Sequence, residues 1–173
     1  LSTKLSDAKA MTVLTLQDLA IQSGVAFGTS GARGKVVDMT PGLCHAYTTA
    51  FLNAVVPKAT TVVLGHDLRP SSPAIAAACA AAIQSLGMQV VYGGALPTPA
   101  LALYAAQLGA PAIVVTGSHI PFDRNGIKFY REEGEITKAD ERAMLDFLVG
   151  VPRDLKLPAL PTPDPRVEQA YVR

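Results

Sequence analysis

A long segment without charged side chains constrains the fold of this chain more than any other feature. From Pro70 through Phe122 the sequence contains no Asp, Glu, Lys or Arg. Such a segment must be buried, either within its own domain or under another one. Glycines and prolines at positions 87, 93, 94, 97, 99, 109 and 111 divide it into pieces too short to span a bilayer. It therefore predicts the buried strands and helices of a globular protein.

Short apolar runs of the strand type alternate with helical patterns along the chain. Thr40 and Pro41 suit the cap and the first position of a helix, and Ser71 or Ser72 suits the cap of another. The expected helices cover residues 14–21, 41–55, 73–86, 98–108 and 138–148, and the expected strands cover residues 35–37, 61–64, 89–92, 112–116 and 127–130. This alternation predicts an α/β fold, in the form of a three-layer α/β/α domain with a mostly parallel, mixed sheet.

Composition divides the chain into three parts. Residues 1–26 form an expected N-terminal extension with a short helix, and residues 27–150 form the α/β domain. Five prolines between positions 152 and 165 mark residues 151–173 as a linker, in which a helical pattern starts at Arg166. We therefore expect the first domain of a longer protein, followed by the beginning of a second domain.

Charge and cysteine usage exclude several classes of function. The 15 Lys and Arg nearly balance the 14 Asp and Glu, so nothing drives the whole chain toward nucleic acid or an anionic membrane. Any anion binding must therefore be local. Cys44 and Cys79 lie in apolar helical segments and are expected in the core, rather than in a disulfide or a metal site. The lack of a disulfide pattern fits a cytoplasmic protein.

Ser118 is the candidate for chemistry. It lies on the loop Thr116-Gly117-Ser118-His119-Ile120-Pro121, after a buried apolar run, where α/β proteins commonly place functional side chains. A hydrolase nucleophile elbow requires G-x-S-x-G, which this loop does not supply. His119 is a poor base for Ser118, because adjacent side chains of extended backbone diverge. Two interpretations remain: a polar residue that ends a strand, and a serine that carries a phosphoryl group.

Two basic side chains could neutralise a phosphoryl group on Ser118. A phosphoserine carries a charge of about −1.5 to −2 at neutral pH, and its transfer depends on positioned cations and a metal more than on a strong base. Lys128 follows the serine loop, and Arg33 lies with Ser30 on a glycine-rich loop, residues 27–34, whose donors suit an anion. That loop does not match G-x-G-x-x-G, so a dinucleotide site is disfavoured. The alternative for the glycine-rich loop is a tight turn with Arg33 on the surface, and the alternative for Lys128 is an ordinary exposed lysine of a strand.

A third loop, Gly65-His66-Asp67-Leu68-Arg69-Pro70, joins an expected strand to an expected helix. We favour a structural role for Asp67 and Arg69, as a pair that fixes the loop, over contact with a substrate. His45 and His66 are likewise interpreted as structural.

Four motifs in this order resemble the α-D-phosphohexomutase family, whose bacterial members include phosphomannomutase/phosphoglucomutase. They are Phe27-Gly28-Thr29-Ser30-Gly31-Ala32-Arg33-Gly34, Gly65-His66-Asp67-Leu68-Arg69-Pro70-Ser71-Ser72, Thr116-Gly117-Ser118-His119-Ile120-Pro121 and Asn125-Gly126-Ile127-Lys128. The resemblance covers roughly residues 27–148. The ordered combination makes it specific, which no single motif would do.

The resemblance implies a phosphoserine mechanism. Members of the family have four domains around a cleft, and a serine of the first domain exchanges a phosphoryl group with hexose 1- and 6-phosphates through a hexose 1,6-bisphosphate. Ser118 matches this serine, and Arg33 matches an arginine near it. His119 and Lys128 match residues implicated in proton transfer and phosphate binding. The implied partners are hexose phosphates and the remaining domains of the same parent chain.

The resemblance also implies Mg²⁺, bound by a phosphoserine oxygen and by three aspartates of a DGDGDR-like loop in the second domain. This chain contains no such loop, so Ser118 would be its only metal ligand, through its phosphate. We therefore expect the isolated chain to be inactive as a mutase.

Three positions bear on how fully the resemblance holds. The family's serine loop commonly reads T-A-S-H-N-P, whereas this chain has Gly117 and Ile120. The glycine is expected to be a mild change, while the isoleucine removes an amide that could hydrogen-bond within the loop. Ser30 stands where phosphoglucosamine mutases usually have Asp, which disfavours an amino sugar. Ile120 favours the alternative hypothesis, a noncatalytic α/β module that binds phosphate or a partner.

Overall fold

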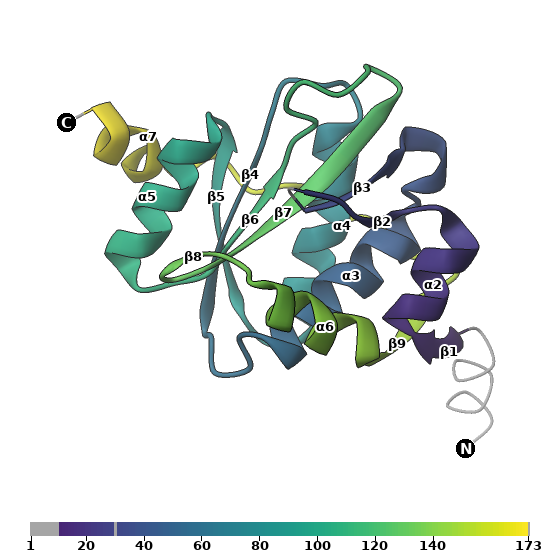
Figure 1. The fold of residues 1–173 in the computed structure, drawn as a ribbon. Coiled ribbons are helices and arrows are strands. Elements are labelled where there is room, and N and C mark those ends of the chain that lie inside the picture. The colour runs from purple at the N-terminus through teal and green to yellow at the C-terminus, as the bar shows by residue number, and fades with distance from the viewer. Residues whose placement is uncertain (1–10, 30, 173) are drawn as a thin grey trace.

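The alternating apolar pattern folds into a seven-stranded sheet between two layers of helices in the computed structural model, which describes residues 11–29 and 31–172 (Figure 1). The strands of this sheet are β2 (Ala26–Phe27), β3 (Ala32–Lys35), β4 (Thr61–His66), β5 (Gln89–Ala95), β6 (Ala112–Val115), β7 (Arg124–Arg131) and β8 (Gly134–Glu135). The helices are α2 (Leu16–Ser23), α3 (Pro41–Ala54), α4 (Ser72–Ser85), α5 (Thr98–Leu108), α6 (Lys138–Asp146) and α7 (Pro165–Val172).

The strand order of the sheet is β2-β3-β7-β6-β4-β5, with β8 paired to β7. Strand β4 pairs in parallel with β5 and with β6, whereas β7 pairs antiparallel with both β6 and β3. Strands β3, β4, β5 and β6 therefore run in one direction and β7 runs against them. This arrangement confirms the predicted α/β class with a mixed sheet and helices on both sides. It also brings the carboxyl ends of β4 and β6 to the same edge as the start of β7.

Side chains of the central strands point alternately into two cores. On β4, Val62 and Leu64 face the core under α3 and α4, while Val63 faces the core under α5. Figure 1 shows these helices on opposite sides of the sheet. Strands buried on both faces are continuously apolar, which explains why the charge-free segment runs through β6, all four residues of which are buried.

Cys44 and Cys79 are free thiols that are fully buried in the core under α3 and α4. This confirms the prediction that both are core residues. Burial raises the pKa of the Cys79 thiol to about 12, and burial together with the neighbouring Cys79 raises that of Cys44 well above its usual value. Both thiols therefore stay protonated at neutral pH and are unsuited to nucleophilic chemistry.

Helix boundaries follow the predicted caps closely. Thr40 is the N-cap of α3, and its Oγ1 accepts a hydrogen bond from Leu43 N at 3.3 Å. Helix α4 has Ser71 at the cap position, without a side-chain hydrogen bond, and α5 covers the predicted residues 98–108. The predicted strand at residues 35–37 is wrong. Residues 32–35 are extended because they pair with β7, and Val36–Asp38 form a 3-10 turn.

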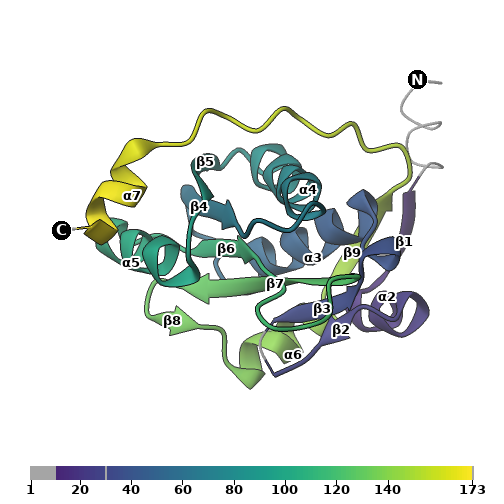
Figure 2. The ribbon, with the colours of Figure 1, turned by 90° about the horizontal axis from the view of Figure 1, so that it is seen from above.

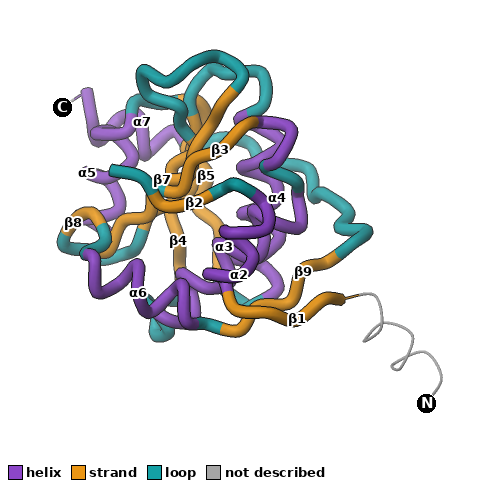
Figure 3. Tube along the Cα trace, turned by 45° about the vertical axis from the view of Figure 1, so that its right-hand side comes forward, coloured by secondary structure: helices purple, strands orange, loops and turns teal. Residues whose placement is uncertain are grey.

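A second, two-stranded sheet was not predicted from the sequence. Strand β1 (Met11–Thr15) pairs antiparallel with β9 (Leu148–Pro152), beside the central sheet (Figure 3). The predicted helix at 14–21 therefore begins only at Leu16, and the one at 138–148 ends at Asp146. Leu16 and Leu19 of α2 are buried in the main core. Residues assigned to an extension and to a linker thus pack against the α/β domain, and the division into three parts stays a prediction.

The chain between β9 and α7 follows the outside of the domain, as the yellow segment of Figure 2 shows. It is anchored where Asp164 N donates a hydrogen bond to Tyr92 O at 2.7 Å, and Val167 of α7 is buried in the core under α5. None of the helices within residues 11–29 and 31–172 combines the length and the apolar character needed to cross a membrane.

Candidate functional site

The serine loop, residues 116–123, connects β6 to β7 at the carboxyl edge of the parallel strands. Ser118 and His119 are exposed there, while Gly117 is buried. Ser118 has a φ of 51°, and no other non-glycine residue in the described part of the chain has a positive φ. This conformation costs an L-residue about 1–2 kcal/mol, and such strain persists where the surroundings impose it. The loop therefore presents the Ser118 hydroxyl in a geometry that its neighbours must maintain.

Asp67, at the end of β4, ties the serine loop to the loop before α4. Its Oδ2 accepts a hydrogen bond from Gly117 N at 2.9 Å, and its Oδ1 accepts from Ser72 Oγ at 2.5 Å and from Arg69 N at 3.1 Å. Burial raises the pKa of Asp67, but these hydrogen bonds and the charge of Arg69 outweigh it, so the pKa lies below its ordinary value. The carboxylate is thus ionised when the loop is formed.

Arg69 holds the serine loop from below through backbone carbonyls. Its Nη1 donates to Pro121 O at 2.9 Å and to Arg124 O at 3.0 Å, and its Nη2 donates to Ile120 O at 2.6 Å and to Ser118 O at 3.5 Å. Its Nε lies 3.4 Å from Asp67 Oδ2, which confirms the predicted Asp67–Arg69 pair. The extent of the contact with the serine loop was not predicted.

Gly117 leaves room for the guanidinium of Arg69. A Cβ on Gly117 would lie within 3.0 Å of the Nε, Cζ and Nη2 atoms of Arg69. The backbone of Gly117 does not have a positive φ, so the position of the guanidinium, and not the backbone conformation, is what a side chain there would disturb.

Asn125 fastens the start of β7 to the helix α4. Its Nδ2 donates to Ser71 Oγ at 2.9 Å and to Ser72 Oγ at 3.0 Å, and its own Oδ1 accepts from Gly126 N. The side chain is fully buried. Asn125 thus completes a polar network that joins three of the four sequence motifs.

Arg33 and Lys128 lie on the same face of the sheet, next to the serine loop. Arg33 is directly opposite Gly126 in the β3–β7 pair, and Lys128 is two residues further along β7. Since alternate residues share a face, both side chains project from the same side as diagonal neighbours. A Cβ on Gly126 would lie 3.1 Å from Arg33 Cγ and 3.0 Å from Thr116 O, so Gly126 lies between Arg33 and the beginning of the serine loop. The structure therefore brings both predicted cations toward the loop that carries Ser118.

The glycine-rich loop lies against β7 beside Lys128. Gly31 has a φ of 79°, and a Cβ there would lie 3.1 Å from Lys128 Cα and would overlap the Ile127 carbonyl. Gly28 lies beside Arg33, whose Cδ is 3.8 Å from the position of a Cβ on that glycine. Ser30, the remaining predicted phosphate-binding residue, lies outside the described residues.

The described residues do not form a metal site by themselves. Nowhere in residues 11–29 and 31–172 do three or more His, Cys, Asp or Glu side chains gather so that they could hold a metal ion.

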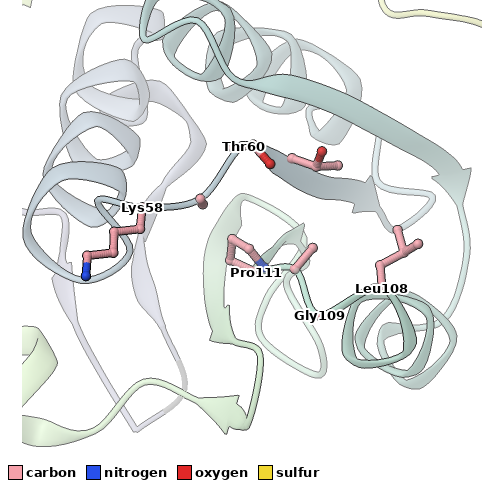
Figure 4. A pocket seen from close by; sticks show the side chains of 8 residues that line it. Lys58, Thr60, Leu108, Gly109 and Pro111 are labelled. Atoms are coloured by element: carbon pink, nitrogen blue, oxygen red, sulfur yellow. The ribbon is translucent and has the colours of Figure 1, made fainter.

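A pocket at the opposite edge of the sheet lacks comparable chemistry. It is lined by residues 58–61 and 108–111, at the amino ends of β4 and β6 (Figure 4). Lys58 is its only charged side chain and points away from Leu108 and Pro111 in this view. The serine loop thus remains the better candidate site.

The ionised Asp67 makes the serine loop sensitive to acid. Its pKa is lower in the folded chain than in the unfolded one, so its contribution to stability is complete above the unfolded value of about 4. That contribution is lost as the pH falls through the folded pKa. We expect the free energy of unfolding, measured with urea between about pH 7 and pH 3, to fall less steeply for Asp67→Asn than for the unsubstituted chain.

Asp140 supplies a comparison remote from the serine loop. Although its burial opposes ionisation, hydrogen bonds from Arg131 and Thr137 keep its pKa below the ordinary value. Asp140→Asn should remove the acid-sensitive contribution of Asp140 to the free energy of unfolding. The protection factor of the Gly117 amide against hydrogen exchange should still fall at acid pH in this variant. If the protection factor of the Gly117 amide still fell at acid pH in Asp67→Asn, the acid sensitivity of the serine loop could not be assigned to Asp67.

Comparisons with known proteins agree with this geometry. Residues 24–148 match the family model of phosphoglucomutase/phosphomannomutase, alpha/beta/alpha domain I. Over 130 residues the chain is 56% identical to a phosphomannomutase of Salmonella muenchen, in a match that covers 74% of this chain and 27% of that protein. A phosphomannomutase of Sinorhizobium fredii is 50% identical over 126 residues, with 70% and 27% covered. The chain thus spans about a quarter of the length of these two relatives.

More distant proteins share the same region. A phosphoglucosamine mutase of Pelotomaculum thermopropionicum is 36% identical over 138 residues, which cover 75% of this chain and 31% of that protein. The crystal structure of a phosphoglucomutase/phosphomannomutase family protein from Burkholderia thailandensis superposes with a TM-score of 0.61 at 28% identity, covering 71% of this chain and 29% of that one. The chain therefore belongs to the phosphoglucomutase/phosphomannomutase family and contains its alpha/beta/alpha domain I.

Proposed function

We propose that this chain is the phosphoryl-carrying domain of a phosphohexomutase, an isomerase that interconverts hexose 1-phosphates and hexose 6-phosphates. The observation that carries the proposal is the exposed Ser118 on a strained loop, beside a sheet face that presents Arg33 and Lys128. A phosphoryl group on Ser118 would be stabilised by these cations. The names of the relatives support a mutase that acts on sugar phosphates.

The proposed reaction has two half-reactions at Ser118. In the first, the bond between Ser118 Oγ and phosphorus breaks as a hydroxyl oxygen of the hexose phosphate forms the new bond. The sugar hydroxyl loses its proton and Ser118 Oγ gains one. In the second, the hexose 1,6-bisphosphate returns its other phosphoryl group to Ser118. His119, exposed next to Ser118, is proposed to carry a proton in these steps.

The remaining parts of the proposal depend on segments outside this chain. Mg²⁺, when bound, would neutralise charge on the phosphoryl group, and Ser118 would contribute one ligand through its phosphate. The other metal ligands and the sugar-binding groups would come from further domains of the parent protein. We therefore expect little or no mutase turnover from residues 1–173 alone, and we propose a cytoplasmic location for the parent.

The proposed substrate class is mannose or glucose phosphate rather than an amino-sugar phosphate. The two phosphomannomutases above are 56% and 50% identical to this chain, whereas the matched phosphoglucosamine mutase is 36% identical. Ser30 supports the same choice. The identity of the hexose would be determined by the sugar-binding groups of the other domains.

Ile120 supports the alternative, a noncatalytic module that retains the fold. In this structure, however, residue 120 contributes to the loop through its carbonyl, which accepts a hydrogen bond from Arg69 Nη2. Its backbone N–H donates to Gly117 O at 3.0 Å. The loop is thus held by the main chain of residue 120, which weakens the argument for a lost function.

A chimera can test the proposed function. Residues 24–148 would replace the matched segment of the Salmonella muenchen phosphomannomutase, and the product would be incubated with glucose 1,6-bisphosphate. We expect its intact mass to increase by one phosphoryl group, located at Ser118 by peptide mapping, and we expect it to interconvert mannose 1- and 6-phosphates. A folded chimera without phosphate on Ser118 would contradict the proposed function. Robust turnover by residues 1–173 alone would contradict the proposed need for further domains.

A further inference from the structure

The guanidinium of Arg69 is directed at the backbone of its own chain. A guanidinium has five N–H donors. Here the Nη donors face the carbonyls of Ser118, Ile120, Pro121 and Arg124, and Nε forms an ion pair with Asp67 Oδ2 at 3.4 Å. Only 17% of the side chain is exposed. Arg69 therefore acts on the backbone of the serine loop, whereas Arg33 and Lys128 lie on the face of β3 and β7.

The acceptors of Arg69 enclose the one strained residue of the loop. Ser118 O and Ile120 O accept from the same nitrogen, and the backbone between them contains His119. On the other side of Ser118, Gly117 N donates to the carboxylate that pairs with Arg69. The positive φ of Ser118 is thus bracketed by contacts to Arg69 and Asp67.

Gly117 determines whether Arg69 can occupy this place. The space that a Cβ would take at Gly117 is filled by the Nε, Cζ and Nη2 atoms of Arg69. An alanine would require the guanidinium to shift, and we expect the shift to weaken its hydrogen bonds to the loop carbonyls. Gly117 and Arg69 are therefore a coupled pair.

We propose that Arg69 is a positioning residue whose guanidinium, admitted by the missing side chain of Gly117, holds Ser118 in the backbone conformation from which it exchanges a phosphoryl group. The exchange itself rests on the proposed function. The structural part does not: Arg69 acts on the loop backbone and is not a ligand of the phosphoryl group or the sugar.

A double-mutant cycle on the 173-residue chain tests the structural part. The variants are Gly117→Ala, Arg69→Ala and the two combined, and the measurement is amide hydrogen exchange of Gly117 and Ser118 by NMR. Each single substitution is expected to speed this exchange by about tenfold or more. The double variant should be no faster than Arg69→Ala, because the alanine then has nothing to displace.

Two further variants complete the cycle. Gly28→Ala is the matched control, because a Cβ there meets only ordinary contacts at 3.8 Å and beyond, and it should leave the exchange at residues 117 and 118 unchanged. Arg69→Lys should fail to restore protection, since one ammonium cannot donate to all these carbonyls, and it replaces Arg69→Ala if that variant does not fold. Unchanged exchange in Gly117→Ala, or strictly additive effects, would overturn the proposal.

The chimera separates this inference from the proposed function. With Arg69→Lys, kcat should fall while KM changes little, because Arg69 does not touch the substrate. A rise in KM at unchanged kcat would show that Arg69 binds substrate and would overturn the positioning role. Protected loop amides in a chimera that never acquires phosphate would instead contradict the proposed function alone.

Discussion

Removing the hydroxyl of Ser118 should abolish mutase turnover and covalent phosphate in the chimera. The reaction proposed above passes through a phosphoryl group on this oxygen, and loss of a covalent nucleophile lowers turnover by roughly 10⁴-fold or more. Ser118→Gly is the sharpest variant, because glycine adopts the observed φ of 51° without strain. The loop should then keep its conformation and lose only the hydroxyl. Coupled assay of mannose phosphate interconversion and intact mass would measure both losses.

Two companion variants distinguish loss of the hydroxyl from loss of loop geometry. Ser118→Thr keeps a hydroxyl, but a β-branched residue is a genuine outlier at positive φ, so we expect strongly reduced turnover as well. Ser85→Ala, in which the lost hydroxyl donates only to Ala82 O near the end of α4, should leave turnover unchanged. Near-normal turnover in Ser118→Gly would remove Ser118 from the mechanism.

The sequence predicted the central sheet because burial alone determines those strands. Residues 61–64 and 112–116 are almost entirely buried and became β4 and β6, and residues 89–92 began the longer edge strand β5. The edge of the domain was harder. Strand β3 is short, follows Gly31 and contains Gly34, so its extended conformation depends on pairing with β7 rather than on its own residues.

The pairing of β1 with β9 illustrates the same limit. These segments are far apart in the sequence, and neither has the strict alternation that identifies a strand. Their register, from Met11 opposite Pro152 to Thr15 opposite Leu148, is a tertiary property. The predicted helices at 14–21 and 138–148 therefore included residues that the structure places in β1 and β9.

For the candidate site, the candidate residues could be predicted from the sequence, but the contacts that each of them makes could not. Ser118, Arg33 and Lys128 were identified from loop position and charge, and the structure brings them to one region. Arg69 was expected to pair with Asp67, but sequence spacing does not show that carbonyls some fifty residues away converge on its guanidinium. Asn125 was visible only as part of a motif, and its contact with α4 required the fold.

This division separates two kinds of positive charge around Ser118. Arg69 is neutralised by Asp67 and occupied by backbone carbonyls, so its contribution is the shape of the loop. Lys128 is half-buried on the open face, and its ammonium has no hydrogen-bond or ion-pair partner among the residues that the structure describes. An unpaired ammonium next to a serine loop is available to a phosphate, which makes Lys128 the cation whose loss should affect chemistry most directly.

Lys128→Ala should therefore lower kcat of the chimera by about 10²- to 10³-fold, the range for loss of one preorganised donor that stabilises developing negative charge. The free energy of unfolding should change by less than about 1 kcal/mol, since no partner of the ammonium is left unsatisfied. Steady-state assays and urea unfolding of the same preparation would measure the two effects. Lys128→Arg keeps the charge on a longer, planar group and should recover part of the loss.

Lys58→Ala is the matched control for the charge, because Lys58 is exposed at the opposite edge of the sheet. It changes the net charge by the same amount and should leave kcat unaltered, so a general electrostatic effect on substrate encounter would appear in both variants and a local one only in Lys128→Ala. Raising the ionic strength discriminates further, because long-range attraction is screened beyond about 10 Å at 0.1 M salt while a contact with the phosphoryl group is not. Turnover of Lys128→Ala within about twofold of the parent would exclude Lys128 as a phosphate ligand. In that event Arg33, which lies on the same face of the sheet opposite Gly126, would be the next cation to test as the group that stabilises the transferred phosphoryl.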